Sequence, residues 1–270
     1  MLRPRSRRLG ALRWRAGALL CAGVLAACDP VPTEQVPEPT PSNGRLTARV
    51  VAPTLTVPLG LTVQTITEGG RPFGLYVPSN YTADTNWPVT VLLHGSGASG
   101  EGMALDFKDY AEATGLVVLA PNSYSITWDL IAFGQFSVDR TYIDNMLKWA
   151  FDHIAADSQR VSISGFSDGA IYAIWLGLKN GDLFSRLGAF TPCLNVPNIR
   201  TGTPEIFMSH GIDDQERPID ACSREIAPVL VNAGYTVQYV EYPSPLGNGH
   251  YITPEVITQG MTFLAKPVGQ

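Results

Sequence analysis

The chain has 270 residues, of which 45% are hydrophobic and 16% charged, and this is enough for one domain with a sizeable core. No apolar run reaches the roughly 20 residues that a membrane-spanning helix needs, which excludes a multi-span membrane protein. The formal charge is −5, but residues 1–27 hold six arginines and no acid, which leaves 13 basic against 24 acidic residues in the rest. Because a remainder this acidic repels phosphate backbones, nucleic acid is not expected as a partner.

The N-terminal segment has the order of a bacterial export signal. An arginine-rich start precedes an apolar stretch of about a dozen residues, 16–27. Residues 25–28 read Leu-Ala-Ala-Cys and resemble the bacterial lipobox, in which small residues precede a cysteine that is lipidated and becomes the new N-terminus. We therefore expect a signal peptide over 1–27 and a lipid anchor at Cys28 that holds the protein on a bilayer, on the extracytoplasmic side (periplasmic or cell surface). The alternative is an ordinary signal peptide with Cys28 incidental.

The next segment, 28–48, is rich in Pro, Thr and Glu and has almost nothing to bury, so it is predicted as an extended tether. Residues 49–270 are predicted as a single folded domain. Its two cysteines, Cys193 and Cys222, are expected to form a disulfide, because a lone pair outside the cytoplasm usually does. The alternative is two buried free thiols. No His or Cys lies at ligand spacing nearby, and neither a metal nor a cofactor is expected.

Strand and helix signals alternate along this domain. Residues 62–67 and 73–77 are rich in β-formers and flank a Gly-Gly turn, which predicts an antiparallel hairpin. Two continuous apolar runs, 89–93 and 116–120, are typical of buried strands. Further strands are predicted at 160–164, 187–190, 205–209 and 236–242, and helices at 100–114, 139–156, 168–178, 221–233 and 254–265.

This alternation predicts an α/β fold with a mostly parallel central sheet and helices on both faces. The longest irregular stretch, 122–138, carries Tyr124, Trp128 and Phe133, which we expect to form the wall of an acyl or aryl pocket. For Trp128 the alternative is ordinary core packing. No insertion between strands is long enough for a lid domain, so an open cleft is expected.

Residues 165–169 read Gly-Phe-Ser-Asp-Gly, a G-x-S-x-G pattern between a predicted strand and a predicted helix. In that context the glycines permit a tight turn that exposes the serine oxygen above the sheet, at a helix N-terminus. Ser167 is therefore the expected nucleophile. The alternative is a glycine-flanked turn with an incidental serine.

A serine hydroxyl needs a base, and the chain offers four histidines. His250 lies in a glycine-rich loop after the last predicted strand, at the end of the sheet where α/β clefts form, and it is the expected base. His94 and His210 follow strands and are expected to orient the loops that they start. His153 lies within a predicted helix.

The acid should fall between serine and histidine in the chain order of α/β-hydrolases. Asp213 and Asp214 are both candidates, because they share a loop after the strand predicted at 205–209. One carboxylate would accept the imidazole N–H and stabilise the imidazolium. For the oxyanion hole we expect the backbone N–H groups of Asp168, directly after the nucleophile, and of Ser96, in the loop after an early strand.

Shorter motifs occur together with this site. They are Leu93-His94-Gly95, Ala120-Pro121, residues 161–169, His210-Gly211 with Asp214 and Pro218, and Gly249-His250. On these motifs the chain from about Phe73 to the C-terminus resembles the phospholipase/carboxylesterase branch of the α/β-hydrolase superfamily. It is also similar to the secreted polyhydroxybutyrate depolymerase and feruloyl esterase group.

The resemblance implies the α/β-hydrolase fold and an open-cleft esterase acting on short or aromatic acyl esters. In those families the acid follows the His-Gly pair at the spacing of Asp214, with a proline four residues later, so the resemblance favours Asp214 over Asp213. The chain departs from the families at Ala170, where a second glycine is usual, and at Arg140, where an acid is often found.

The expected function is a serine hydrolase that cleaves carboxylic esters, small or polymeric, through an acyl-enzyme intermediate. Ser167 would attack the ester carbonyl with His250 as base, and water would then release the acyl group. One alternative is a serine peptidase or polyester depolymerase that uses the same triad. Another is a non-catalytic binding lipoprotein on a hydrolase scaffold.

Overall fold

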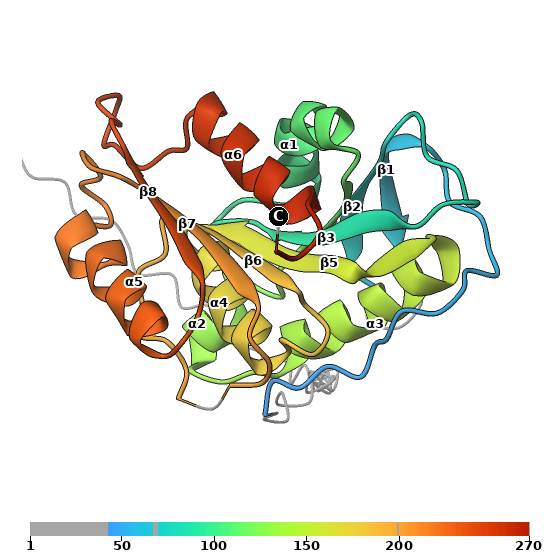
Figure 1. The fold of residues 1–270 in the computed structure, drawn as a ribbon, viewed down its shortest axis with the longest axis horizontal. Coiled ribbons are helices and arrows are strands. Elements are labelled where there is room, and N and C mark those ends of the chain that lie inside the picture. Colours follow the sequence, from blue (N-terminus) through green and yellow to red (C-terminus); the bar gives the residue numbers. More distant parts are fainter. Residues whose placement is uncertain (1–42, 67–69, 199, 270) are drawn as a thin grey trace, which may run out of the picture. The chain divides into compact units, whose positions relative to one another are not determined.

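A computed structural model describes residues 43–66, 70–198 and 200–269 of the chain (Figure 1). The predicted signal peptide and the lipidation site at Cys28 lie outside these residues. Within the described residues, no helix combines the length and the apolar character that crossing a membrane requires.

The described residues form one sheet in the order β1-β2-β4-β3-β5-β6-β7-β8. Strand β2 is antiparallel to both β1 and β4, and the other neighbouring pairs are parallel. The prediction of a mostly parallel sheet with an N-terminal antiparallel hairpin is therefore confirmed. The strands are β1 (Gly60–Thr65), β2 (Pro72–Val77), β3 (Trp87–Leu93), β4 (Val117–Pro121), β5 (Ala156–Phe166), β6 (Arg186–Phe190), β7 (Glu205–Gly211) and β8 (Val237–Tyr242).

Helices cover both faces of the sheet, with α1 and α6 on one face and α3, α4 and α5 on the other (Figure 1). Successive residues of a strand point to opposite faces, so Leu92 packs with the α1 and α6 side while Val91 and Leu93 pack with the other. The helices are α1 (Gly100–Thr114), α2 (Asp129–Phe133), α3 (Val138–His153), α4 (Asp168–Lys179), α5 (Ser223–Asn232) and α6 (Pro254–Ala265), with a 3-10 turn η1 (Ile219–Ala221).

Two boundaries differ from the sequence prediction. The helix predicted at 139–156 ends at His153, because Ile154 adopts an extended conformation (φ −119°, ψ 129°) and leads into β5, which begins at Ala156. The helix predicted at 221–233 is divided into η1 and α5. The backbone of Cys222 between them is not helical (φ −120°, ψ −103°).

The start of the body also differs. Residues 43–48, which composition assigns to the end of the tether, pack against the sheet-and-helix body, and the side chains of Leu46 and Ala48 are buried. The Asp144 carboxylate of α3 accepts the backbone N–H groups of Thr47 (2.7 Å) and Ala48 (2.8 Å). Because these contacts are with residues almost 100 positions away, the local sequence carries no signal for them. The predicted boundary at residue 48 is therefore wrong.

Candidate active site

Ser167 occupies the sharp turn between β5 and α4. Its backbone has φ 55° and ψ −119°, a region that residues with side chains rarely adopt. The flanking glycines make the turn possible: a Cβ at Gly169 would lie 2.3 Å from the carbonyl oxygen of Leu93, and one at Gly165 would lie 2.4 Å from the carbonyl carbon of Gly169. The G-x-S-x-G pattern thus places a nearly buried serine at the carboxyl ends of β3 and β5.

A hydrogen-bond chain connects this serine to two residues far along the sequence. The distance from Ser167 Oγ to His250 Nε2 is 2.9 Å, and His250 Nδ1 lies 2.7 Å from Asp214 Oδ2. With Nδ1–H donating to the carboxylate, Nε2 is the acceptor for the serine hydroxyl. Asp213 faces Ser244 instead, whose backbone N–H donates to Asp213 Oδ2 at 2.8 Å. The structure thus brings Ser167, His250 and Asp214 together and places Asp213 elsewhere.

The Asp214 carboxylate is buried, with hydrogen bonds to both oxygens. Asp214 Oδ1 accepts the backbone N–H groups of Glu216 (3.0 Å) and Arg217 (2.8 Å), while Oδ2 faces His250. These bonds offset the cost of removing a carboxylate from water. Gly249 (φ +77°) allows the histidine loop to approach, because a Cβ there would lie 2.2 Å from the carbonyl oxygen of Asp213.

His210 is buried directly beside this acid, with Nε2 3.4 Å from Asp214 Oδ2. Its Nε2–H donates to the carbonyl oxygen of Arg217, and its Nδ1 accepts the hydroxyl of Ser223, both at 2.7 Å. Burial lowers the pKa of His210, against the opposing effects of the Arg217 carbonyl and the Asp214 carboxylate. A neutral His210 therefore connects the loop that carries Asp214 (residues 212–218, called the acid loop below) to the start of α5.

His94 has a similar role at the end of β3. Its Nδ1–H donates to the carbonyl oxygen of Gly95 (2.7 Å), and its Nε2 accepts the backbone N–H of Ser123 (3.0 Å). Burial lowers the pKa of His94, so the ring is neutral near pH 7. The ring thus joins the loop after β3 to the loop after β4.

The two expected oxyanion donors lie close to the nucleophile in the chain and in space. Asp168 follows Ser167 directly, and a Cβ at Gly95, next to Ser96, would lie 3.4 Å from Ser167 Cβ. Over the described part of the chain, the backbone N–H groups of Ser96 and Asp168 donate to no protein acceptor. The neighbouring backbone N–H of Gly97, by contrast, donates to the carbonyl oxygen of Ile126 at 2.7 Å. Both amides are therefore available to a ligand.

The three aromatic residues expected at the substrate pocket lie in two kinds of environment. Trp128 is 0% exposed, and its Nε1–H donates to the carbonyl oxygen of His94 at 2.9 Å, so it has no surface to offer a substrate. Its assignment to a pocket wall is wrong: the indole packs on His94 and Tyr172 inside the core. Tyr124 (47% exposed) and Phe133 (51% exposed) are on the surface, and neither lines the pocket described next.

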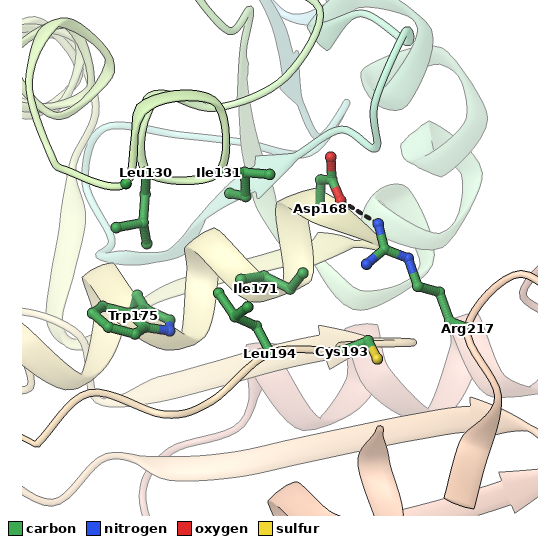
Figure 2. Close-up of a pocket in the computed structure, with 9 residues that line it drawn as sticks. Leu130, Ile131, Asp168, Ile171, Trp175, Cys193, Leu194 and Arg217 are labelled. Carbon is green, nitrogen blue, oxygen red and sulfur yellow. Dashed lines mark hydrogen bonds and ion pairs between the residues drawn. The ribbon is translucent and has the colours of Figure 1, made fainter. Parts of the chain in front are cut away.

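A pocket of about 390 Å³ begins beside the nucleophile and runs along α4 (Figure 2). Figure 2 shows Asp168 and Arg217 joined at one end and Trp175 at the other. Its lining residues are Leu130, Ile131, Gly134, Asp168, Ile171, Trp175, Cys193, Leu194 and Arg217. Sequence reasoning did not identify this wall. The helical spacing of Asp168, Ile171 and Trp175 could have indicated it, because residues three and four apart share one face.

The structure contains the predicted disulfide between Cys193, which follows β6, and Cys222, which precedes α5. Cys193 also lines the pocket. Within the described residues, no group of three or more His, Cys, Asp or Glu side chains is arranged to hold a metal ion.

Residues 65–229, more than half of the chain, match the Esterase family model, which is described as "Putative esterase". Among solved structures, the chain is similar to a thermostable esterase (23% identity, TM-score 0.56), matching 76% of this chain but only 58% of that one. It is also similar to S-formylglutathione hydrolase from Staphylococcus aureus, with 15% identity and a TM-score of 0.60 over 78% of this chain and 100% of that one. A phospholipase/carboxylesterase from Dyadobacter fermentans is similar with 16% identity and a TM-score of 0.54 over 78% of this chain and 98% of that one. These similarities establish the α/β-hydrolase fold, and the chain belongs to the esterase family.

Proposed function

We propose that the protein is a serine carboxylesterase that cleaves carboxylic esters through an acyl-enzyme on Ser167. The observation that carries this proposal is the continuous hydrogen-bond chain from Ser167 Oγ through His250 to Asp214. An isolated serine hydroxyl is a poor nucleophile, and a base held in the correct tautomer by a buried carboxylate is the arrangement that activates it.

In the first half of the reaction, Ser167 Oγ attacks the ester carbonyl carbon as its proton passes to His250 Nε2. Asp214 stabilises the imidazolium, and the N–H groups of Asp168 and Ser96 donate to the oxygen that becomes negative. Collapse of the tetrahedral intermediate breaks the bond to the alcohol, which takes the proton from His250. In the second half, water gives a proton to His250 and attacks the acyl-serine, and the acid is released as Ser167 regains its proton.

The pocket along α4 is the proposed site for the acyl group. It begins at Asp168, next to the nucleophile, and most of its lining is apolar, with Ile171, Trp175 and Leu194 prominent (Figure 2). An apolar wall favours the burial of a hydrocarbon or aryl group from water.

A panel of p-nitrophenyl esters with increasing acyl length tests the proposal. We expect the wild type to turn over these esters and to be labelled by a fluorophosphonate, and we expect Ser167→Ala to do neither while its far-UV circular dichroism is unchanged. Undiminished turnover by Ser167→Ala would overturn the proposed nucleophile. A wild type that neither hydrolyses nor is labelled would favour a binding protein, and activity on aminoacyl anilides alone would favour a peptidase.

We also propose that Cys28 carries the lipid that anchors the protein on the extracytoplasmic side of a bacterial membrane. The small residues before it support this proposal, and so does the Cys193–Cys222 disulfide, because disulfides persist in oxidising compartments. Expression with a labelled fatty acid should label the wild type and not Cys28→Ser. Equal labelling of both proteins would rule out this anchor.

A further inference from the structure

The chemistry proposed above uses the backbone of Asp168 and leaves its side chain without a role. That side chain is 6% exposed and follows Ser167 directly, at the position whose N–H is the proposed oxyanion donor. A carboxylate beside a substrate oxygen that becomes negative opposes the charge that catalysis must stabilise, and the effect is strong where water is largely excluded. The groups that pair with this carboxylate therefore affect how well the negative substrate oxygen is stabilised.

Each oxygen of the carboxylate has its own partner. Asp168 Oδ1 accepts a hydrogen bond from Arg217 Nη2, and Oδ2 accepts one from Thr127 Oγ1, both at 2.6 Å. Figure 2 shows Arg217 reaching across the end of the pocket to Asp168. The guanidinium supplies a full opposite charge from a side chain that is 27% exposed.

Arg217 also belongs to the acid loop. Its backbone N–H donates to Asp214 Oδ1 at 2.8 Å, and its carbonyl oxygen accepts the Nε2–H of His210 at 2.7 Å. One residue therefore contacts both the carboxylate that orients His250 and the residue that carries an oxyanion amide.

Thr127 extends the same set of contacts to the second oxyanion amide. The carbonyl oxygen of its neighbour Ile126 accepts the backbone N–H of Gly97 at 2.7 Å. Gly97 follows Ser96, the other proposed donor. The Asp168 carboxylate thus connects three loops that together hold the acid and both oxyanion amides.

We propose that the Asp168–Arg217 ion pair sets the geometry and the charge of the oxyanion site, with Arg217 as a positioning residue for ester hydrolysis. The guanidinium cancels the carboxylate charge beside the forming oxyanion and ties the α4 turn to the acid loop. This inference rests on the proposed function, because it assigns the ion pair to a reaction at Ser167.

Charge removal on either side of the pair distinguishes this role from simple stabilisation. In Arg217→Gln the carboxylate loses its counter-charge, and we expect kcat to fall about 10²-fold, comparable to the loss of one oxyanion donor, with KM within about threefold of wild type. In Asp168→Asn no unpaired anion remains although the tie to the acid loop is weakened, so kcat should fall by less than in Arg217→Gln. The double variant, with both substitutions, should have a kcat at least tenfold higher than that of Arg217→Gln alone.

Arg160→Gln is the matched control. The Arg160 side chain is 24% exposed and pairs with Asp157 at 2.7 Å near the start of β5, at the end of that strand opposite to Ser167. We expect it to keep the wild-type kcat. Melting temperatures show whether each variant is folded, and Arg217→Lys, which keeps the charge, provides a second test should Arg217→Gln not fold: its kcat should exceed that of Arg217→Met.

Three results would overturn the inference: a kcat for Arg217→Gln within threefold of that of Arg160→Gln, a double variant no faster than Arg217→Gln, or Arg217→Lys no faster than Arg217→Met. Ser167→Ala, measured in the same assay, separates this inference from the proposed function. If Ser167→Ala retains turnover, the proposed function fails. If Ser167→Ala is inactive while Arg217→Gln keeps the wild-type kcat, only the role of the ion pair fails.

Discussion

Reduction of the Cys193–Cys222 disulfide should lower activity before it unfolds the protein. The bond closes a loop with a sequence separation of 29, and the chain-entropy model assigns such a cross-link about 3.6 kcal/mol of stability. A domain of this size has an unfolding free energy of roughly 5–15 kcal/mol, so we expect the reduced protein to remain folded at 25 °C.

The position of the bond explains why activity should be more sensitive. Cys222 precedes Ser223, whose hydroxyl donates to His210, and His210 lies against Asp214. Cys193, at the other end of the closed loop, lines the pocket. Reduction therefore frees both ends of the segment that carries Asp214. Because displacements of about 1 Å in catalytic geometry can cost about 10²-fold in rate, we expect at least a tenfold loss of kcat/KM.

A dithiothreitol titration measures both properties on the same samples. Ester hydrolysis should decline at concentrations where far-UV circular dichroism is still native, in step with the appearance of free thiols. The variant with both cysteines replaced by alanine is the control, and it should be insensitive to dithiothreitol, with low activity from the start. Parallel loss of activity and circular dichroism, or full activity in the reduced protein, would refute the argument that the bond holds the acid loop in place.

Three further predictions concern stability. Leu46→Ala should lower the unfolding free energy by about 2–5 kcal/mol in urea titrations, because Leu46 is buried against the body. A change under about 0.5 kcal/mol would mean that residues 43–48 belong to the tether and not to the folded body. Gly169→Ala should give no soluble folded protein, because its Cβ would meet the carbonyl oxygen of Leu93 at 2.3 Å, and a native circular dichroism spectrum would contradict this. Burial lowers the pKa of His94 and His210 below the usual value of 6.5, so the unfolded state takes up protons first as pH falls. The unfolding free energy from urea titrations should therefore be lower at pH 6.0 than at pH 7.5, and equal values at the two pH would contradict this.

The elements with the strongest sequence signals are predicted closely. The helix at 100–114 agrees with α1 at both ends, because Ser99 caps its first turn through the N–H of Gly102, and Gly115 ends it in the left-handed conformation (φ 65°). Strand β3 is also found where a continuous apolar run indicates it. In these segments the local chemistry and the tertiary structure favour the same conformation.

The errors occur where distant contacts decide the structure. Trp128 lies in an irregular stretch and has the character of a pocket residue, yet its indole N–H is bound by the carbonyl oxygen of His94, 34 positions away. Leu46 lies in a Pro- and Thr-rich stretch, and Asn180, 134 positions away, accepts its backbone N–H. Neither contact has a local pattern, so composition alone assigns both residues to the wrong environment.

The candidate site contains both kinds of residue within a few ångströms: those that a local sequence pattern indicates and those that only distant contacts place. Ser167 and His250 each stand among glycines at a strand end or loop, and the carboxyl ends of parallel strands meet at one edge of the sheet, so sequence can predict that they approach each other. The Asp168–Arg217 contact has no such signature, because its partners are 49 positions apart and a charged residue on a loop is usually solvated. Family motifs identify the groups that would react. The side chains that set the charge around them depend on how neighbouring loops pack, and only the structure reveals them.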